Sequence, residues 1–365
     1  MKPDISVTFT GLKFSNPFLL SSAPPTESDS NIMRAFDAGW GGVVTKTIGL
    51  HPVTNVAGPK TKFLRSTLDG RLSMQKRPET SLHSSWNWEL ISDKTLDWWV
   101  PRLGRIKQAF PNHALVASIM AGSGSDKELA AWQTLAKACQ DEGADAFELN
   151  LSCPHMDRKD MGSNIGKDQA QVSIVTEVVK EVAKVPVWCK LTPSTTDIVE
   201  EASAAFNGGA DAIVSSNTFP SLPLIDPETL DFEMNVDGLV SSGGLGGPAI
   251  LPQSLAKMAS LTQAFPGKSF SGIGGVSEFA HALNYMLLGC GTVQVCTAAM
   301  LDRAIGPNII KGLIEGMQQF MEKRGYASLE DFRGLRRANV VVHSQIRRPD
   351  GKEYHGGHEA EGYAS

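Results

Sequence analysis

The chain has 365 residues, of which 41% are hydrophobic and 20% are charged, proportions typical of a globular protein with a large core. A net charge of −5 without any lysine- or arginine-rich run excludes a nucleic-acid partner held by general electrostatics. No segment approaches the roughly 20 apolar residues of a membrane span, and the N-terminus lacks a targeting pattern, so a cytoplasmic location is expected.

Short apolar segments followed by polar or glycine-rich loops recur along the chain, with helical stretches such as 127–143 and 197–209 between them. Their apolar residues run almost without interruption, as in strands buried on both faces of a parallel sheet. Strands that alternate with helices indicate βαβ units. The pattern predicts the α/β class and a (β/α)8 TIM barrel, with an open doubly wound sheet as the alternative. The segments are 17–23, 41–48, 114–120, 145–152, 186–192, 211–218, 268–275 and 292–300.

Two segments interrupt this rhythm. Residues 50–95 follow the second predicted strand and residues 219–247 follow the sixth, so both are expected as insertions on the C-terminal face of the barrel, where active sites form. Tryptophans in "WNWELISDK" favour an ordered, lid-like structure for the first insertion. The barrel is expected to span residues 1–336, and the polar stretch 337–365 is expected to be an exposed, flexible tail.

Polar residues or glycines stand at the C-terminal ends of six predicted strands. Because these ends meet at one mouth of a barrel, the residues are expected to converge there. The turns at 272–276 and 294–299 follow strands seven and eight, where barrels frequently bind phosphate through backbone N–H groups. The converging residues are Lys46, Thr47, Asn150, Ser152, Cys153, Lys190, Asn217, Thr218, Gly274, Gly275, Cys296 and Thr297.

Lysines and asparagines at this mouth suggest its ligand. A buried lysine without an anionic partner is costly, so Lys190 either pairs with a barrel carboxylate or faces a ligand that becomes anionic, such as a reduced flavin ring. Lys46 has the same two interpretations. Asn87, Asn150 and Asn217 offer carboxamides, which match both an N–H and a C=O on one ligand edge. These residues favour a ligand with an imide edge, while a loop or cap role stays open for each asparagine.

The 5 cysteines form no Cys-x-x-Cys pair and show no metal-ligand spacing, which predicts reduced thiols and no metal site. Cys153 alone is expected on a loop over the barrel mouth, directly before Pro154. A thiol with an ordinary pKa of about 8.5 is mostly protonated near neutral pH and can give its proton to a carbon. His155 makes a Cys/His hydrolase the alternative, although that activity gives the lysines and the phosphate turn no role.

An ordered set of motifs resembles the flavin-containing pyrimidine domain of dihydropyrimidine dehydrogenases, relatives of class 1 dihydroorotate dehydrogenases. The motifs are "TKT", "NWELIS", "NLSCPH", "KLTP", "SNT", "GIGG" and "QVC", within a likeness that covers nearly the whole chain. The resemblance implies an FMN-containing (β/α)8 barrel that acts on the 5,6 bond of uracil or thymine. It also implies that Cys153 protonates C5 while a hydride passes from the flavin N5 to C6.

The same resemblance assigns binding positions. It implies that the pyrimidine is bound by Asn87, Asn150, Ser152, Asn217 and Thr218. It implies that FMN is bound by Ser22, Lys46, Thr47, Lys190, Gly247, Gly274, Gly275, Cys296 and Thr297.

The chain departs from the family pattern after the barrel and in the loop after Cys153, and its loop 219–247 is only loosely similar. No cysteine follows Cys296, so the iron–sulfur segment that usually follows the barrel is not expected. A separate electron-transfer partner is expected instead. The loop after Cys153 carries Arg158 and Lys159 in place of a small, glycine-rich sequence. The alternatives to a pyrimidine substrate are dihydroorotate or another cyclic amide. A further alternative is a non-catalytic flavin-barrel subunit. A homo-oligomer is also expected.

Overall fold

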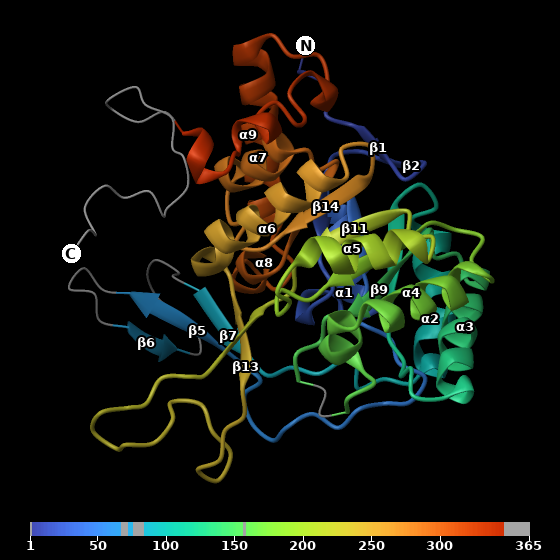
Figure 1. Ribbon diagram of the computed structural model, residues 1–365, viewed down its shortest axis with the longest axis vertical. Coiled ribbons are helices and arrows are strands. Elements are labelled where there is room, and N and C mark those ends of the chain that lie inside the picture. Colours follow the sequence, from blue (N-terminus) through green and yellow to red (C-terminus); the bar gives the residue numbers. More distant parts are fainter. Residues whose placement is uncertain (1, 67–71, 76–83, 156–157, 347–365) are drawn as a thin grey trace, which may run out of the picture.

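The computed structural model describes residues 2–66, 72–75, 84–155 and 158–346. Eight parallel strands pair in chain order and close into a barrel, which confirms the predicted (β/α)8 fold (Figure 1). Each strand lies within one of the eight predicted segments. The barrel strands are β3 (Phe18–Leu20), β4 (Gly42–Val44), β8 (Ala114–Ile119), β9 (Ala146–Leu151), β10 (Val187–Leu191), β11 (Ala212–Ser215), β14 (Ser269–Ile273) and β15 (Thr292–Val295).

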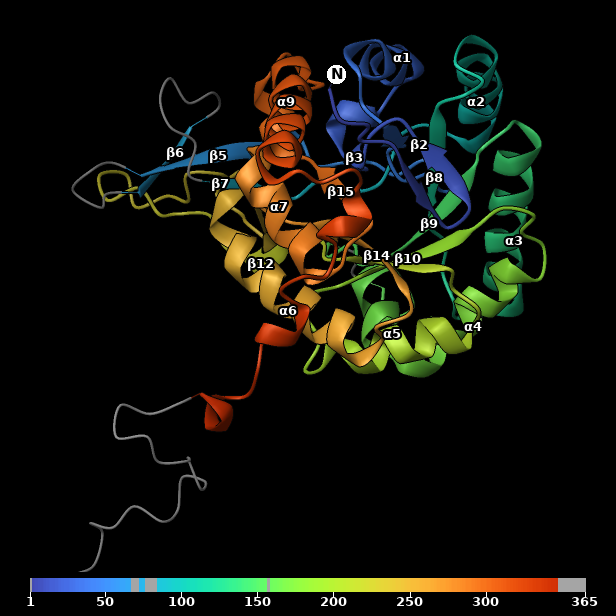
Figure 2. The same ribbon diagram turned by 90° about the horizontal axis from the view of Figure 1, so that it is seen from above.

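Helices surround the barrel, as the view from above shows (Figure 2). Several begin at a polar side chain that accepts a hydrogen bond from a backbone N–H of the first turn. These N-caps are Ser28, Thr95, Ser125, Asp168 and Asp197. The α-helices are α1 (Asp29–Ala38), α2 (Leu96–Ala109), α3 (Asp126–Asp141), α4 (Gln169–Lys180), α5 (Ile198–Asn207), α6 (Leu251–Ala264), α7 (Phe279–Leu288), α8 (Thr297–Leu301) and α9 (Pro307–Arg324). Short 3-10 turns are η1 (Pro24–Thr26), η2 (Gly162–Lys167), η3 (Pro248–Ile250), η4 (Leu329–Asp331), η5 (Arg337–Asn339) and η6 (His343–Gln345).

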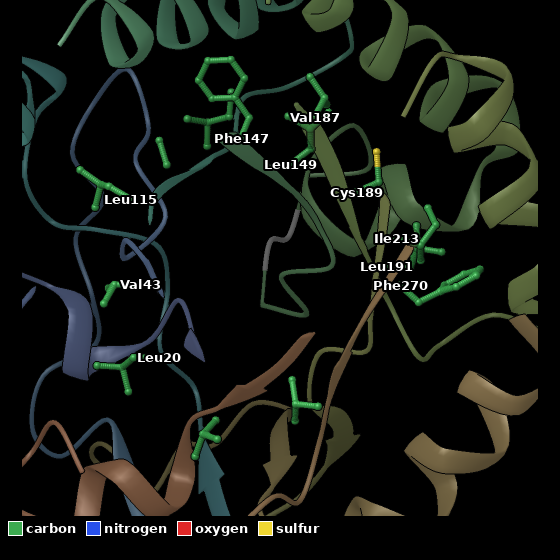
Figure 3. Packing of buried hydrophobic residues seen from close by; sticks show 14 of the residues in the cluster. Leu20, Val43, Leu115, Phe147, Leu149, Val187, Cys189, Leu191, Ile213 and Phe270 are labelled. Atoms are coloured by element: carbon green, nitrogen blue, oxygen red, sulfur yellow. The ribbon is translucent and has the colours of Figure 1, made fainter. Parts of the chain in front are cut away.

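Side chains of the barrel strands alternate between the surrounding helices and the barrel interior. Phe147 and Leu149 of β9 belong to the large core between strands and helices (Figure 3). Cys189 of β10 belongs to the same core. The period of two therefore turns the intervening Glu148 and Lys190 inward, where both are buried.

An antiparallel hairpin closes the N-terminal end of the barrel. It consists of β1 (Val7–Phe9) and β2 (Leu12–Phe14). The Phe9 ring meets the Trp188 ring edge to face, with centroids 5.2 Å apart. Trp188 Nε1 also donates a hydrogen bond to Thr10 Oγ1 at 3.0 Å. These contacts fill the bottom of the barrel with apolar side chains.

The two predicted insertions pair with each other in one five-stranded sheet, in the order β12-β13-β7-β5-β6. Its strands are β5 (Thr61–Ser66), β6 (Leu72–Gln75), β7 (Ser84–Asn87), β12 (Phe219–Ser221) and β13 (Gly243–Gly246). Trp86 and Trp88 of the first insertion share a small core with Met234 of the second. Residues 67–71 and 76–83 of the first insertion lie outside the described part, and an ordered lid stays a prediction.

The described part of the predicted tail contacts the barrel helices. Gln263 of α6 donates a hydrogen bond to the carbonyl of Arg337 at 2.9 Å, and Arg337 Nη1 donates to the carbonyl of Pro266 at 3.2 Å. Residues 347–365 lie outside the described residues, so the predicted boundary at residue 336 and the predicted flexibility of the tail stay predictions. Among the helices that the structure describes, none is both long and apolar enough to cross a membrane.

Candidate active site

A cavity with about 990 Å³ of empty space, part of it open to solvent, lies at the C-terminal mouth of the barrel. Loops after β3, β4, β9, β11, β14 and β15 contribute to its wall together with the insertion sheet. Every predicted site residue except Ser152 lines it. These lining residues are Ser22, Lys46, Thr47, Asn87, Asn150, Cys153, Lys190, Asn217, Thr218, Gly247, Gly274, Gly275, Cys296 and Thr297.

Lys190 reaches the cavity floor from inside the barrel and has a carboxylate partner. Its Nζ lies 3.2 Å from Glu148 Oε1, and the two residues are 4% and 0% exposed. Gln294 Nε2 donates to the second Glu148 oxygen at 2.8 Å. The interpretation of Lys190 as one half of a buried ion pair is therefore confirmed, and its position in the cavity wall leaves it within reach of a ligand.

Lys46 is paired as well. Its Nζ lies 2.9 Å from Glu89 Oε2, and Thr61 donates a hydrogen bond to Glu89 Oε1 at 2.8 Å. Thr61 and Glu89 both come from the first insertion. The Lys46–Glu89 ion pair therefore connects the first insertion to the end of β4. Each of the two lysine–glutamate pairs has a net charge of zero.

A chain of hydrogen bonds orients two of the asparagines. Asn217 Nδ2 donates to Ser152 Oγ at 3.0 Å, Ser152 Oγ donates to Asn150 Oδ1 at 3.0 Å, and Asn150 Nδ2 donates to Thr47 Oγ1 at 2.9 Å. Ser152 is fully buried behind the cavity wall. The backbone N–H of Ser152 also bonds to Asn150 Oδ1, at 3.2 Å, so both lone pairs of that oxygen are used and one N–H of Asn150 stays available to a ligand.

Asn87 stands at the end of β7, opposite Gly244 of β13. Its Nδ2 donates to the Gly244 carbonyl at 3.3 Å, and its Oδ1 accepts the backbone N–H of Glu89 at 3.3 Å. One amide hydrogen and one lone pair remain for a ligand. A Cβ on Gly244 would overlap the side chain of Thr218, so the close approach of β13 to the cavity wall depends on glycine.

The turn after β14 packs against the N-terminus of α6. Gly274 and Gly275 have φ angles of 124° and 79°, a region that favours glycine. A Cβ on Gly275 would lie 2.6 Å from the Cβ of Leu251, the first residue of α6. With Gly247 and the start of α8 at Thr297, these backbones form a concave corner of the cavity that suits an anionic group.

Cys153 lies in the cavity wall but is only 4% exposed, and burial raises the pKa of its thiol. His155 contacts the carbonyl of Glu89 through Nδ1 at 3.0 Å, and burial lowers the pKa of its imidazole. Both shifts favour the neutral forms. A thiolate–imidazolium pair, which a Cys/His hydrolase needs, is therefore disfavoured at this site.

Comparison with known proteins identifies the family of the chain. Residues 93–321 match the model of the dihydroorotate dehydrogenase family. The chain belongs to this family. Dihydropyrimidine dehydrogenase (NADP(+)), chloroplastic, of Arabidopsis thaliana is 36% identical over 353 residues, covering 94% of this chain and 80% of that protein. The NAD-dependent dihydropyrimidine dehydrogenase subunit PreA of Escherichia coli K12 is 33% identical over 347 residues, with the same coverage of 94% and 80%.

Dihydroorotate dehydrogenase B (NAD(+)), catalytic subunit, of Thermococcus kodakarensis is 30% identical over 334 residues, covering 91% of this chain and 97% of that protein. These relatives make this member of the dihydroorotate dehydrogenase family an oxidoreductase. In its described part, no group of three or more His, Cys, Asp or Glu side chains could hold a metal ion.

Three residues that contact the predicted site residues were not themselves predicted from the sequence. Glu89 and Glu148 neutralise the two lysines, and Ser85 bonds Thr297 at 2.9 Å across the two sides of the concave corner. Glu148 was detectable in principle, because it precedes Asn150 by two residues and so faces the same side of its strand. Nothing local marks Glu89 or Ser85, whose partners are distant in sequence.

Proposed function

We propose that the chain is an FMN-dependent oxidoreductase that acts on the 5,6 bond of a pyrimidine base, between uracil or thymine and the dihydro form. The observation that carries the proposal is that the buried thiol of Cys153 and the carboxamides of Asn87, Asn150 and Asn217 line one cavity. The names of the Arabidopsis and Escherichia coli relatives support the same substrate class.

The residues present fit FMN. Gly247, Gly274, Gly275, Cys296 and Thr297 form the concave corner, which would hold the phosphate. Ser22, Lys46, Thr47 and Lys190 would hold the ring. When bound, FMN supplies hydride transfer, a chemistry that no protein side chain offers.

Cys153 supplies the proton in this proposal. Because burial raises the pKa of the thiol, it stays protonated at neutral pH and can protonate C5 of the substrate as a general acid. Ser152 acts behind the wall: its hydroxyl bonds Asn150 and Asn217, so it fixes the direction of two carboxamides that would bind the pyrimidine edge together with Asn87 and Thr218.

Charge favours a neutral pyrimidine over dihydroorotate. An unpaired cation in the cavity would favour a substrate carboxylate. Among the described residues that line the cavity, Lys46 and Lys190 each have a carboxylate partner, and burial lowers the pKa of His155 toward the neutral form. The dihydroorotate activity named for the Thermococcus relative is therefore the second candidate.

The first prediction tests the proposal directly. The purified protein should be yellow, and uracil or thymine should reoxidise its photoreduced flavin under anaerobic conditions, whereas orotate should react far more slowly. Cys153→Ala should keep its flavin and lose about 10²–10⁴-fold in turnover, the usual contribution of a general acid. Full turnover in this variant, or reoxidation by orotate alone, would contradict the proposal. Protein without flavin would favour a non-catalytic subunit.

We also propose a separate electron-transfer partner and a homo-oligomer. The Escherichia coli and Thermococcus relatives are both named as subunits, which supports a partner. The cytoplasmic location stays a prediction.

A further inference from the structure

Arg158, one of two neighbouring basic residues in the loop after Cys153, lies between two carboxylates. Its Nη2 donates to Glu128 and to Asp160, and its Nε donates to Asp160 at 3.0 Å. Glu128 lies in the first turn of α3, where its other oxygen accepts the backbone N–H of Gly124 at 3.1 Å. Arg158 therefore joins the loop after β9 to the loop after β8.

A second set of hydrogen bonds leads from Arg158 back to Cys153. The carbonyl of Arg158 accepts a hydrogen bond from Asn164 Nδ2 at 2.9 Å. Ser163, the neighbour of Asn164, donates its backbone N–H to the carbonyl of Cys153 at 2.9 Å. These two hydrogen bonds thus connect Arg158, through Ser163 and Asn164, to the backbone that carries the thiol.

The two loops also meet closely in space. The backbone N–H of Ser123 donates to the carbonyl of Asp160 at 3.0 Å, and a Cβ on Gly124 would overlap the Asp160 carboxylate. The hydrogen bonds from Arg158 lower the pKa of Asp160, so that carboxylate stays charged. An isolated exposed ion pair contributes little, but here one guanidinium joins two carboxylates. Gly124 N–H holds the Glu128 carboxylate, and Ser123 N–H holds the backbone carbonyl of Asp160.

We propose that Arg158 is a positioning residue, which keeps Cys153 seated in the cavity wall by holding residues 158–164 against the first turn of α3. Arg158, Glu128 and Asp160 do not line the cavity, so they act through the backbone and not by touching the substrate. The purpose of this anchor rests on the proposed function, because a seated thiol matters when it delivers a proton.

Alkylation of Cys153 tests the anchor without any substrate. Iodoacetamide is added to the purified holoenzyme, and the labelling rate of each cysteine is followed by peptide mass spectrometry. Arg158→Ala should raise the labelling rate at Cys153 by about two- to fivefold, because this factor corresponds to the free energy that an exposed ion pair usually contributes. Lys159→Ala, which removes the same charge from the neighbouring exposed position, should leave the rate unchanged.

Cys139 is the internal reference for the fold. It is fully buried in α3, the helix that carries Glu128, so it would be labelled faster if α3 or the whole barrel loosened. Glu128→Gln keeps a side-chain acceptor but removes the charge, and it should reproduce the effect of Arg158→Ala. High salt should raise the wild-type rate toward that of the variants. Equal rates at Cys153 in all variants, or an equal increase at Cys139, would overturn the anchor.

Steady-state kinetics separates positioning from substrate binding. Arg158→Ala should lower kcat by about two- to fivefold at unchanged KM, and Arg158→Lys should recover only part of kcat because one ammonium cannot fork between two carboxylates. A raised KM at unchanged kcat would overturn the role. If Cys153→Ala turns over normally, the proposed function fails, while the labelling experiment still decides whether Arg158 holds the loop.

Discussion

Glu148 and Lys190 are two opposite charges inside one barrel. Removing charges from water costs free energy, and the attraction between them repays it only where geometry and further hydrogen bonds are favourable. Gln294 provides such a bond to Glu148. The need of Lys190 for an anionic partner was predictable from its apolar neighbours, but the choice of Glu148 requires knowing that β9 and β10 pair with Lys190 opposite Asn150.

Breaking this pair should destabilise the protein. Glu148→Gln leaves a buried ammonium without its counter-ion, so the free energy of unfolding should fall by about 3–5 kcal/mol. Denaturant unfolding monitored by tryptophan fluorescence measures the loss. The double variant Glu148→Gln, Lys190→Met removes both charges and should recover most of the stability. If the double variant is no more stable than the single one, an unpaired charge is not the cause.

The buried Cys153 predicts the alkaline limit of activity. Since burial raises the pKa of the thiol, the proton-donating form persists above the ordinary thiol pKa, and turnover should fall only at a higher pH. The raised pKa also means that the neutral thiol contributes to the free energy of unfolding. This contribution is complete below the unfolded pKa of about 8.5 and is lost as the pH rises through the folded pKa of the thiol. A pH profile of pyrimidine reduction checks the limit. Loss of activity well below pH ~8.5, absent from Cys153→Ser, would argue against a buried neutral thiol.

At the scale of elements, the sheet formed by the two insertions is the feature that the sequence did not predict. Both insertions were predicted at the C-terminal mouth of the barrel, where residues of β7 and β13 line the cavity. However, β7 pairs with β13 between segments that are distant in sequence, and only the glycines of "SSGGLGG" hint at close backbone contact. Hydrophobic periodicity reports the local burial of a strand and carries no information about its partner.

The turn after β14 gives a test at this scale. Gly275→Ala adds a Cβ that would meet Leu251 at a φ of 79°, so the concave corner should deform and the affinity for FMN should fall about tenfold. Flavin retained after dialysis, measured by absorbance, reports this loss. Gly267→Ala is the matched control, because Gly267 precedes the same strand and a Cβ there meets no atom within 4 Å. Equal flavin retention in both variants would contradict a role of this turn in binding FMN.

For the whole molecule, the barrel divides stability and chemistry between its two ends. The hairpin and the strand residues around it fill the N-terminal end of the barrel with apolar side chains, while the polar groups gather at the C-terminal end. Eight strands, the barrel and most converging residues were predictable, because a parallel barrel brings every strand end to one mouth. The counter-ions and the insertion sheet were not, because each depends on contacts that exist only after the barrel has closed.

The N-terminal hairpin supplies the test at the scale of the molecule. Phe9→Ala leaves a cavity beneath Trp188 and should lower the free energy of unfolding by about 3–5 kcal/mol. At temperatures where the variant stays folded, its kcat/KM should equal that of the wild type, since no residue of the hairpin lines the active-site cavity. A change in kcat/KM would show that the two ends of the barrel are coupled.

The pairing of β7 with β13 limits how this enzyme can be redesigned. Gly244 lies opposite Asn87 and Gly246 opposite Ser85, so the positions of β7 that line the cavity each have a counterpart on the other insertion. A chimera that receives only one of the two segments from a relative would inherit mismatched neighbours and a displaced Asn87. New specificity should therefore be transplanted as a matched pair of loops, with the glycines of the second chosen together with the tryptophans of the first.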